Sequence, residues 1–169
     1  MSAFDGMSRE QLLKALEMFA KSWLAHDGCW FLAAEERYGM QAAIALDAGS
    51  WARFAAAEAR RILTTFDLPP QGGLEALEQA LALRMYAVIN AQRSEWSADR
   101  KTLRFFMDVC RVQETRRRKG LPDFPCKSVG LVEFETFART VDPRLRTRCL
   151  HCPPEAPEGK YCAWEFTVE

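Results

Sequence analysis

Apolar residues recur every three or four positions through most of residues 8–95, which is the spacing of helices that bury one face. Ser8 followed by Gln11 is a capping-box arrangement, so the first helix is predicted to begin there. Its apolar stripe comprises Leu12, Leu16, Phe19, Ala20 and Trp23. The run 26–28 predicts the end of this helix, because Gly tolerates the left-handed turn of a helix terminus.

The same spacing predicts four further helical stretches. We expect a short helix over 30–38 that stops at Gly39, and a segment over 41–48 that leads into a helix over 50–66. Prolines and glycines at 69–73 interrupt the pattern. A long helix is then predicted over 74–94.

The spacing of apolar residues is no longer helical after Asp99. Alternating residues over 103–109 indicate a buried strand that ends at the basic run 116–119, and later strands are expected over 145–149 and 161–168. A short helix is expected over 131–141. These patterns predict an α+β fold in which an N-terminal helical layer packs on a small C-terminal antiparallel sheet. A single domain, 1–169, would comprise a helical part (8–95) and a cysteine-bearing α+β part (101–169).

The composition indicates which kinds of partner the protein can bind. Apolar residues make up 49% of the chain and charged residues 27%, which argues against a wholly disordered protein. Lys plus Arg and Asp plus Glu each total 23, so no general electrostatic attraction to nucleic acid or to an anionic membrane is expected. The chain start lacks a secretory pattern, and no apolar run approaches the roughly 20 residues of a membrane span. We therefore expect a cytoplasmic protein without nucleic-acid or membrane partners.

Five of the six cysteines lie after residue 100. Cys149 and Cys152 are separated by two residues, so their sulfurs can hold one metal ion from a single turn, and Cys162 can complete the site from a neighbouring strand. Cys126 is the expected fourth ligand and Cys110 the reserve. Thiolates suit zinc or an iron–sulfur cluster, and spacing does not separate the two.

Other interpretations of these cysteines stay open. Four sulfurs around zinc would form a closed structural site, whereas three sulfurs and an open position would be catalytic. His151 could replace one sulfur. The thiols could also be reduced core residues, or Cys149 and Cys152 could form a thiol–disulfide switch.

Two carboxylates occupy positions where an apolar residue is expected. Glu58 lies on a helical stripe with Trp51 and Ile62, and Glu35 lies among apolar residues before Gly39. A buried carboxylate is costly unless it is paired, protonated or bound to a cation. Glu35 and Glu58 could therefore act as acid and base or hold a substrate amine, as could the nearby His26 and Asp27. The alternative is a structural ion pair between Glu58 and an arginine.

The aromatic residues and the basic run each allow two interpretations. Trp23, Trp30, Phe31 and Trp51 could line a ligand pocket or form ordinary core. The run 116–119, with Arg111 and Lys127, could bind a phosphate or carboxylate group, although such a run is more often a solvated strand end.

Several short segments carry a resemblance to a known family. In the N-terminal half they are Asp27-Gly-Cys-Trp-Phe31, Glu35, Gly39 and Trp51. In the C-terminal half they are Cys110-Arg-Val-Gln113, Lys119-Gly-Leu-Pro-Asp-Phe-Pro-Cys126, Cys149-Leu-His-Cys-Pro-Pro154 and Tyr161-Cys-Ala-Trp-Glu-Phe166. The chain resembles small, uncharacterised bacterial cytosolic proteins similar in layout to aminothiazoline-carboxylate hydrolases. The resemblance implies a soluble α+β fold and the opening of a small cyclic amidine by water.

The sequence therefore favours a metal–thiolate protein with a carboxylate-bearing pocket that binds or hydrolyses a small organic molecule. The alternative is a non-catalytic redox or ligand sensor, or an adaptor, with a structural metal site. The oligomeric state does not follow from these patterns.

Overall fold

The computed structural model describes residues 2–169, and helices precede most of the strands along the chain. The helices are α1 (Arg9–Tyr38), α2 (Met40–Thr65), α3 (Gly73–Ala82), α4 (Met85–Ile89), α5 (Arg111–Arg118) and α6 (Lys127–Val141). The strands are β1 (Ala91–Trp96), β2 (Thr102–Val109), β3 (Leu145–His151) and β4 (Ala163–Val168). The predicted α+β class is confirmed, with β1 beginning inside the part expected to be helical.

Helix α1 begins where the capping box predicts and ends later than expected. Gln11 N donates to Ser8 Oγ at 3.2 Å, and Ser8 N donates to Gln11 Oε1 at 2.8 Å. The predicted end at 26–28 is wrong, because the helix continues through Gly28 to Tyr38. A single glycine costs a helix interior only about 1 kcal/mol, and packing beyond it exceeds that cost. One such contact is between the rings of Phe31 and Phe124, whose centroids are 4.7 Å apart.

Helices α1 and α2 form an antiparallel hairpin around one residue. Gly39 has a φ of 81°, which glycine adopts without the steric cost that a side chain would bring. The stretches predicted separately over 41–48 and 50–66 form one continuous helix, α2. Its buried row, including Trp51, Ala55 and Ile62, faces the rest of the fold.

The predicted long helix over 74–94 is wrong. The chain forms α3, the short α4 and then β1 instead. The break falls at Arg84, whose backbone is extended (φ −68°, ψ 154°) and whose side chain is buried between two carboxylates. Long-range ion pairing therefore overrides a local pattern that favours helix.

The four strands form one antiparallel sheet in the order β1-β2-β4-β3. The strands expected at 103–109, 145–149 and 161–168 are confirmed with shifted ends. The basic run 116–119 is not a strand end: its first three residues finish helix α5, and Arg116 is buried.

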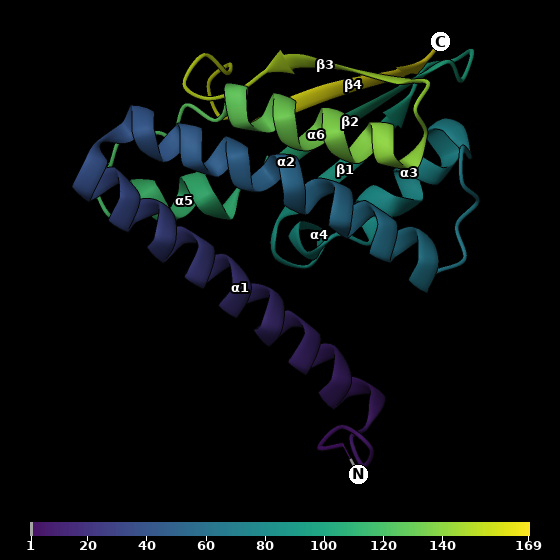
Figure 1. Ribbon diagram of the computed structural model, residues 1–169, viewed down its shortest axis with the longest axis horizontal. Helices are drawn as coiled ribbons and strands as arrows, with labels where there is room; N and C mark the ends of the chain where they lie inside the picture. Colours follow the sequence, from purple (N-terminus) through teal and green to yellow (C-terminus); the bar gives the residue numbers. More distant parts are fainter. Residues whose placement is uncertain (1) are drawn as a thin grey trace.

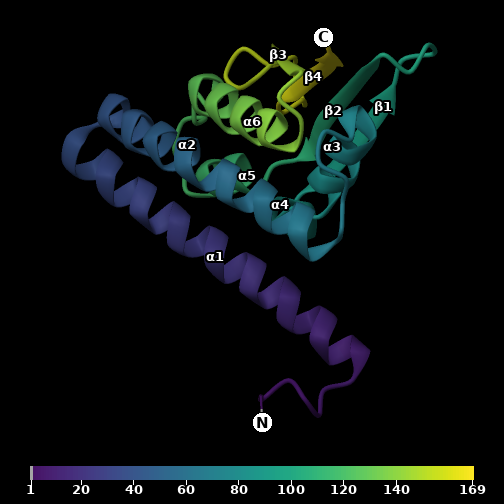
Figure 2. The same ribbon diagram turned by 45° about the vertical axis from the view of Figure 1, so that its right-hand side comes forward.

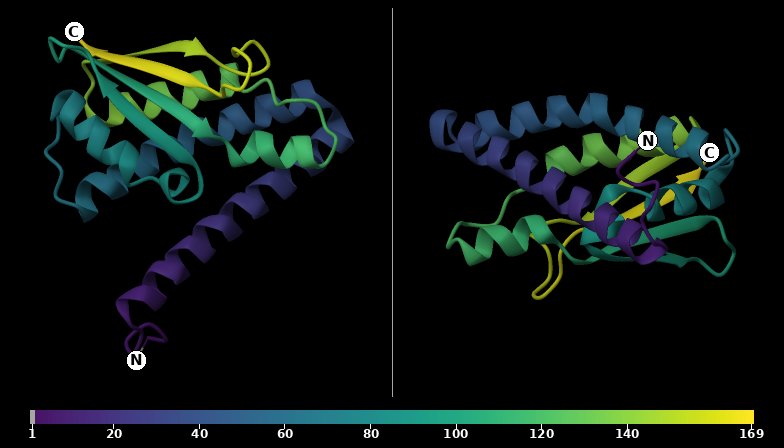
Figure 3. Two further views of the ribbon diagram at one scale, coloured as in Figure 1. Left: turned by 180° about the vertical axis from the view of Figure 1, so that it is seen from behind. Right: turned by 90° about the horizontal axis from the view of Figure 1, so that it is seen from below.

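Helix α6 lies between the sheet and α2 and forms the centre of the core, as Figures 1 and 3 show. The ring centroids of Phe134 on α6 and Trp164 on β4 are 4.7 Å apart. Gly130 permits this approach, because a Cβ built on it would lie 2.6 Å from Trp164 Cζ2. Helix and sheet therefore meet closely along the side of α6 that carries Gly130 and Phe134.

The first turns of α1 extend away from the other elements (Figures 1 and 2). Nearly every residue over 9–19 is exposed, and large apolar side chains are among them. These are Leu12, Leu13, Leu16, Met18 and Phe19. Among the described residues, no helix has the length and apolarity needed to cross a bilayer.

Candidate functional site

A pocket of about 430 Å³ lies between the helices and the sheet. Its walls come from α1, α2, α4, α5, α6 and the two central strands. Most of the surface is apolar, and the aromatic and sulfur-bearing lining residues include Phe31, Trp51, Tyr86, Met107, Phe124, Phe134 and Trp164. The volume is within the range of sites that take drug-sized ligands, about 300–1,000 Å³.

Three carboxylates from three helices line this pocket: Asp27 on α1, Asp47 on α2 and Glu133 on α6. Burial raises the pKa of Asp27. Burial, followed by the charges of Asp27 and Glu133, raises the pKa of Asp47 to about 7. Burial also raises the pKa of Glu133, against the opposing attraction of Arg84. Asp27 and Glu133 are therefore close enough to Asp47 to disfavour its ionisation, and Asp27 does the same to Glu133.

Glu58 does not line the pocket. It lies behind the pocket wall, where its Oε2 accepts a hydrogen bond from Arg84 Nε at 2.8 Å. Arg84 Nη2 lies 2.7 Å from Glu133 Oε1, so one buried guanidinium bridges two buried carboxylates. Of the two roles considered for Glu58, this geometry matches the structural ion pair, with Arg84 as the arginine.

Glu35 is held in a bidentate ion pair rather than facing the pocket. Arg116 Nη1 and Nη2 lie 2.6 and 2.9 Å from its two oxygens, and this interaction lowers the pKa of Glu35. His26 is exposed and does not line the pocket either. Of the four residues predicted to act on a substrate, only Asp27 reaches the pocket wall.

Four of the cysteines converge beside this pocket. Cys126 is at the start of α6, Cys149 and Cys152 are at the end of β3, and Cys162 directly precedes β4. The sulfurs of Cys149 and Cys152 are 3.4 Å apart. Cys152 also interacts with Cys126 and Cys162, and its thiol, acting as donor, lowers the pKa of Cys126.

The reserve ligand, Cys110, takes a different position. It lines the pocket at the end of β2, where burial raises the pKa of its thiol to about 12. The charges of Cys162 and Cys126 contribute to this shift, so all five cysteines predicted as ligands occupy one region. Cys29 lies apart on α1, where its side chain is exposed.

The thiols contact one another directly. Within residues 2–169, no three or more His, Cys, Asp or Glu side chains are already spaced to hold a metal ion. Sulfurs around a tetrahedral zinc are about 3.8 Å apart, given a Zn–S bond of about 2.3 Å. The pair at 3.4 Å would therefore need to separate by a few tenths of an ångström to bind zinc. The donor set suits such an ion, although the spacing seen is that of packed thiols.

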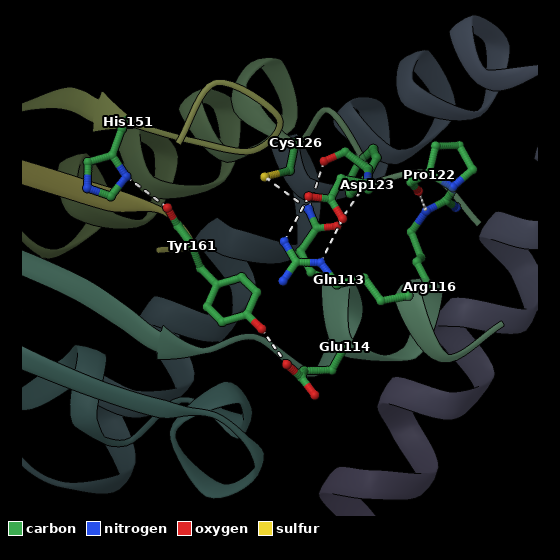
Figure 4. A network of polar contacts seen from close by, with 10 residues as sticks. Gln113, Glu114, Arg116, Pro122, Asp123, Cys126, His151 and Tyr161 are labelled. Carbon is green, nitrogen blue, oxygen red and sulfur yellow. Dashed lines mark hydrogen bonds and ion pairs between the residues drawn. The ribbon is translucent and has the colours of Figure 1, made fainter. Parts of the chain in front are cut away.

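The segment before Cys126 is tied to α5 by the contacts in Figure 4. Gln113 Nε2 donates to Phe124 O at 2.7 Å and Phe124 N donates to Gln113 Oε1 at 2.9 Å, so one buried amide satisfies both backbone groups. Arg116 Nε donates to Pro122 O at 2.7 Å, and Arg117 pairs with Asp123. These bonds fix the backbone that leads into Cys126.

A second set of contacts holds the segment before Cys162 (Figure 4). His151 Nδ1 donates to Tyr161 O at 2.8 Å, and Tyr161 Oη donates to Glu114. The ring nitrogen of His151 nearest this segment is therefore engaged with a carbonyl. The two cysteines of the converging group that also line the pocket, Cys126 and Cys162, thus follow anchored segments.

Sequence analysis missed Asp47 and Glu133. Each interrupts an apolar row at helical spacing: Asp47 lies between Ala43 and Trp51, and Glu133 lies between Val129 and Phe137. The same signal singled out Glu58. Applied to every helix, the same signal would have found Asp47 and Glu133.

Fold and pocket together define an α+β protein with a largely apolar pocket bordered by carboxylates and thiols. The chain matches a family of unknown function (DUF6125) over residues 5–168, and it belongs to that family. No curated protein matches it.

One similar solved structure is a trafficking protein particle complex subunit 3 from Naegleria fowleri, covalently bound to palmitic acid. The TM-score is 0.50 at 10% sequence identity, over 95% of this chain and 97% of that chain. At this identity the likeness concerns the fold alone. The resemblance to aminothiazoline-carboxylate hydrolases stays a prediction.

Proposed function

We propose that this protein binds a small organic molecule in the pocket, beside a metal ion held by Cys126, Cys149, Cys152 and Cys162. One observation carries the proposal: four cysteines from three separate segments meet next to an apolar pocket, and Cys126 and Cys162 belong to its wall. A metal bound there would fasten the end of β3 to the starts of β4 and α6. It would therefore stabilise the pocket wall.

The proposed ion is zinc, with an iron–sulfur cluster as the other candidate that the thiolates suit. Four thiolates around zinc leave no open position, so the ion would act by holding the fold. Cys110 would be a neighbour of the site rather than a ligand. In the described chain all six cysteines are free, which fits the reducing cytoplasmic location that we propose.

The pocket supports binding more directly than hydrolysis. Glu35 and Glu58 are held by Arg116 and Arg84, so neither carboxylate is available to a substrate. Hydrolysis of a cyclic amidine would rely on Asp27 or the other pocket carboxylates as the base. The similar trafficking subunit holds a palmitic acid, which supports an apolar ligand for a pocket of this kind.

Metal analysis tests whether the four cysteines hold a metal ion. Protein purified without oxygen should contain one zinc per chain, or should show the broad visible absorption of an iron–sulfur cluster. Cys152→Ser should lose the metal, because this residue contacts the other three cysteines. Cys29→Ser, an exposed cysteine outside the cluster, is the matched control and should keep it. Folded wild-type protein that lacks both metals would refute the metal site.

A redox or ligand sensor, or an adaptor, is the alternative function. The distance of 3.4 Å between the sulfurs of Cys149 and Cys152 supports the redox version. Oxidation would join the two sulfurs and pass two electrons and two protons to an added disulfide such as oxidised glutathione. Mass spectrometry after that treatment should then show a link between these cysteines. Metal-free protein with this link would favour the switch, whereas metal-loaded protein resistant to oxidation would favour the metal site.

A further inference from the structure

Within residues 2–169, only one of the three pocket carboxylates, Glu133, forms an ion pair with a basic side chain. Asp27, Asp47 and Glu133 face one cavity from three helices, and the basic group that contacts them is Arg84. Arg84 is itself shared with Glu58. Two of the pocket carboxylates therefore have no cationic partner within the described chain, which favours a bound proton or an incoming cation.

A second buried group in the same wall also lacks a partner. Trp164 is 1% exposed, and within residues 2–169 its Nε1–H donates to no acceptor. The ring edge that adjoins Nε1 faces Gly130, another residue of the pocket wall. A buried donor without an acceptor is unfavourable, so this part of the pocket wall is not fully satisfied by the described chain itself.

Aromatic faces accompany the carboxylates. The rings of Trp51 and Tyr86 stack with centroids 5.8 Å apart, and both residues line the pocket. Aromatic faces attract cations as well as apolar groups. The surroundings of the carboxylates therefore suit an organic cation better than a hydrated metal ion, which would need further oxygen ligands.

Cations also border the pocket, and they bear on a competing interpretation. Lys21, Arg118 and Lys119 line it with exposed side chains. Arg116 also lines it and is buried, but it is paired with Glu35, and Arg111 is half-buried. Charge interactions in contact with solvent are screened and contribute far less than those of buried groups. An anionic ligand would gain little from the exposed cations and would meet the carboxylates inside. The unpaired, half-buried Asp27 and Asp47 therefore favour a cation.

We propose that the pocket selects an apolar molecule that ends in a protonated amine. The ammonium group lies among Asp27, Asp47 and Glu133. This inference rests on the proposed function, because it names the chemical class of the ligand for the same pocket.

Three probes with one apolar chain and different head groups test the selectivity: octylamine, octanol and octanoate. Calorimetry at neutral pH should show octylamine binding at least about tenfold more tightly than octanol, as expected for a charge-assisted hydrogen bond in a buried site. Octanoate should bind most weakly. Equal affinities, or tightest binding of octanoate, would overturn the cation selectivity while leaving the pocket itself in place. If none of the three binds, the binding function proposed above fails as well.

Charge-removing variants locate the head group. Asp47→Asn should reduce the preference for octylamine over octanol to about threefold or less, and the double variant with Asp27→Asn should abolish it. Glu36→Gln removes an exposed carboxylate of α1 outside the pocket and should keep the full preference. Binding of octanol reports whether each variant keeps an intact pocket. An unchanged preference in the double variant would refute the assignment of the ammonium position.

Discussion

The buried ion-pair group Glu58–Arg84–Glu133 should be a main determinant of stability. Arg84 is 3% exposed and lies 2.8 and 2.7 Å from the two carboxylates. Arg84→Met keeps most of the side-chain volume and removes the charge, which leaves two buried carboxylates without their cation. Breaking a buried pair in this way costs about 3–5 kcal/mol. For a chain of this length that corresponds to a fall in Tm of about 6–20 °C.

The measurement is urea unfolding and thermal melting of Arg84→Met beside a matched surface variant. Arg100→Met breaks the pair with Glu75, in which both side chains are 59% exposed, so its cost should stay below about 1 kcal/mol. The loss of unfolding free energy in Arg84→Met, relative to the wild type, should shrink as the pH falls. Burial already raises the pKa of Glu133, and without Arg84 the carboxyl gains still more from protonation. Equal stability losses in the two variants would refute this account of the buried group.

Two further predictions concern the pocket wall and the helix interiors. Because burial raises the pKa of Asp47 to about 7, the stability that protonation of this group provides is present below about pH 4 and is lost as the pH rises through 7. Burial is the main cause of this shift, the charges of Asp27 and Glu133 add to it, and the hydrogen bond from Trp51 opposes it. Asp47→Asn should therefore reduce the stability loss between pH 5 and 8 by about 2 kcal/mol, after allowance for solvent screening. Equal losses in urea titrations of both proteins would contradict this. Gly130→Ala should destabilise by about 1–3 kcal/mol through its clash with Trp164, whereas Gly28→Ala, with open space around its Cβ position, should stabilise by about 0.5–1 kcal/mol. Stability changes of the same sign in unfolding titrations would contradict the packing described for α6.

Elements defined by local pattern were predictable from the sequence. Strand β2 alternates between buried and more exposed residues, and α6 has an apolar row at helical spacing before Asp142-Pro143. In both cases local period and tertiary burial agree, so the pattern alone is sufficient. The antiparallel sheet and the preceding helices follow from such segments.

Helix ends that depend on long-range contacts were not predictable from the sequence. The end of α3 depends on Arg84 reaching Glu58 and Glu133, which are 26 residues before it and 49 after it. Conversely, α1 continues past Gly28 because its last turns are held by partners far along the chain, such as Arg116. A single sequence does not show which distant residues meet.

In the candidate site, too, some features were predictable from local spacing and others depended on long-range contacts. The cysteine spacing predicted a cluster, because two sulfurs in one turn and others on flanking segments can converge. The functional assignment of Glu35 and Glu58 depended on whether arginines reach them, and both are paired. Burial identifies a carboxylate as unusual, but only the three-dimensional arrangement distinguishes a pocket group from an ion pair.

The extension of α1 beyond the body has a consequence for how this helix holds together. Over residues 9–19, hydrogen bonds are supported mainly by the local cap and by ion pairs such as Glu10–Lys14, worth about 0.3–0.5 kcal/mol. Isolated helices of this length are marginal in water. The first turns therefore open and reclose independently of the rest of the helix. Backbone amides before Ala20, where packing begins, should exchange with solvent faster than those after it, although the helix is continuous.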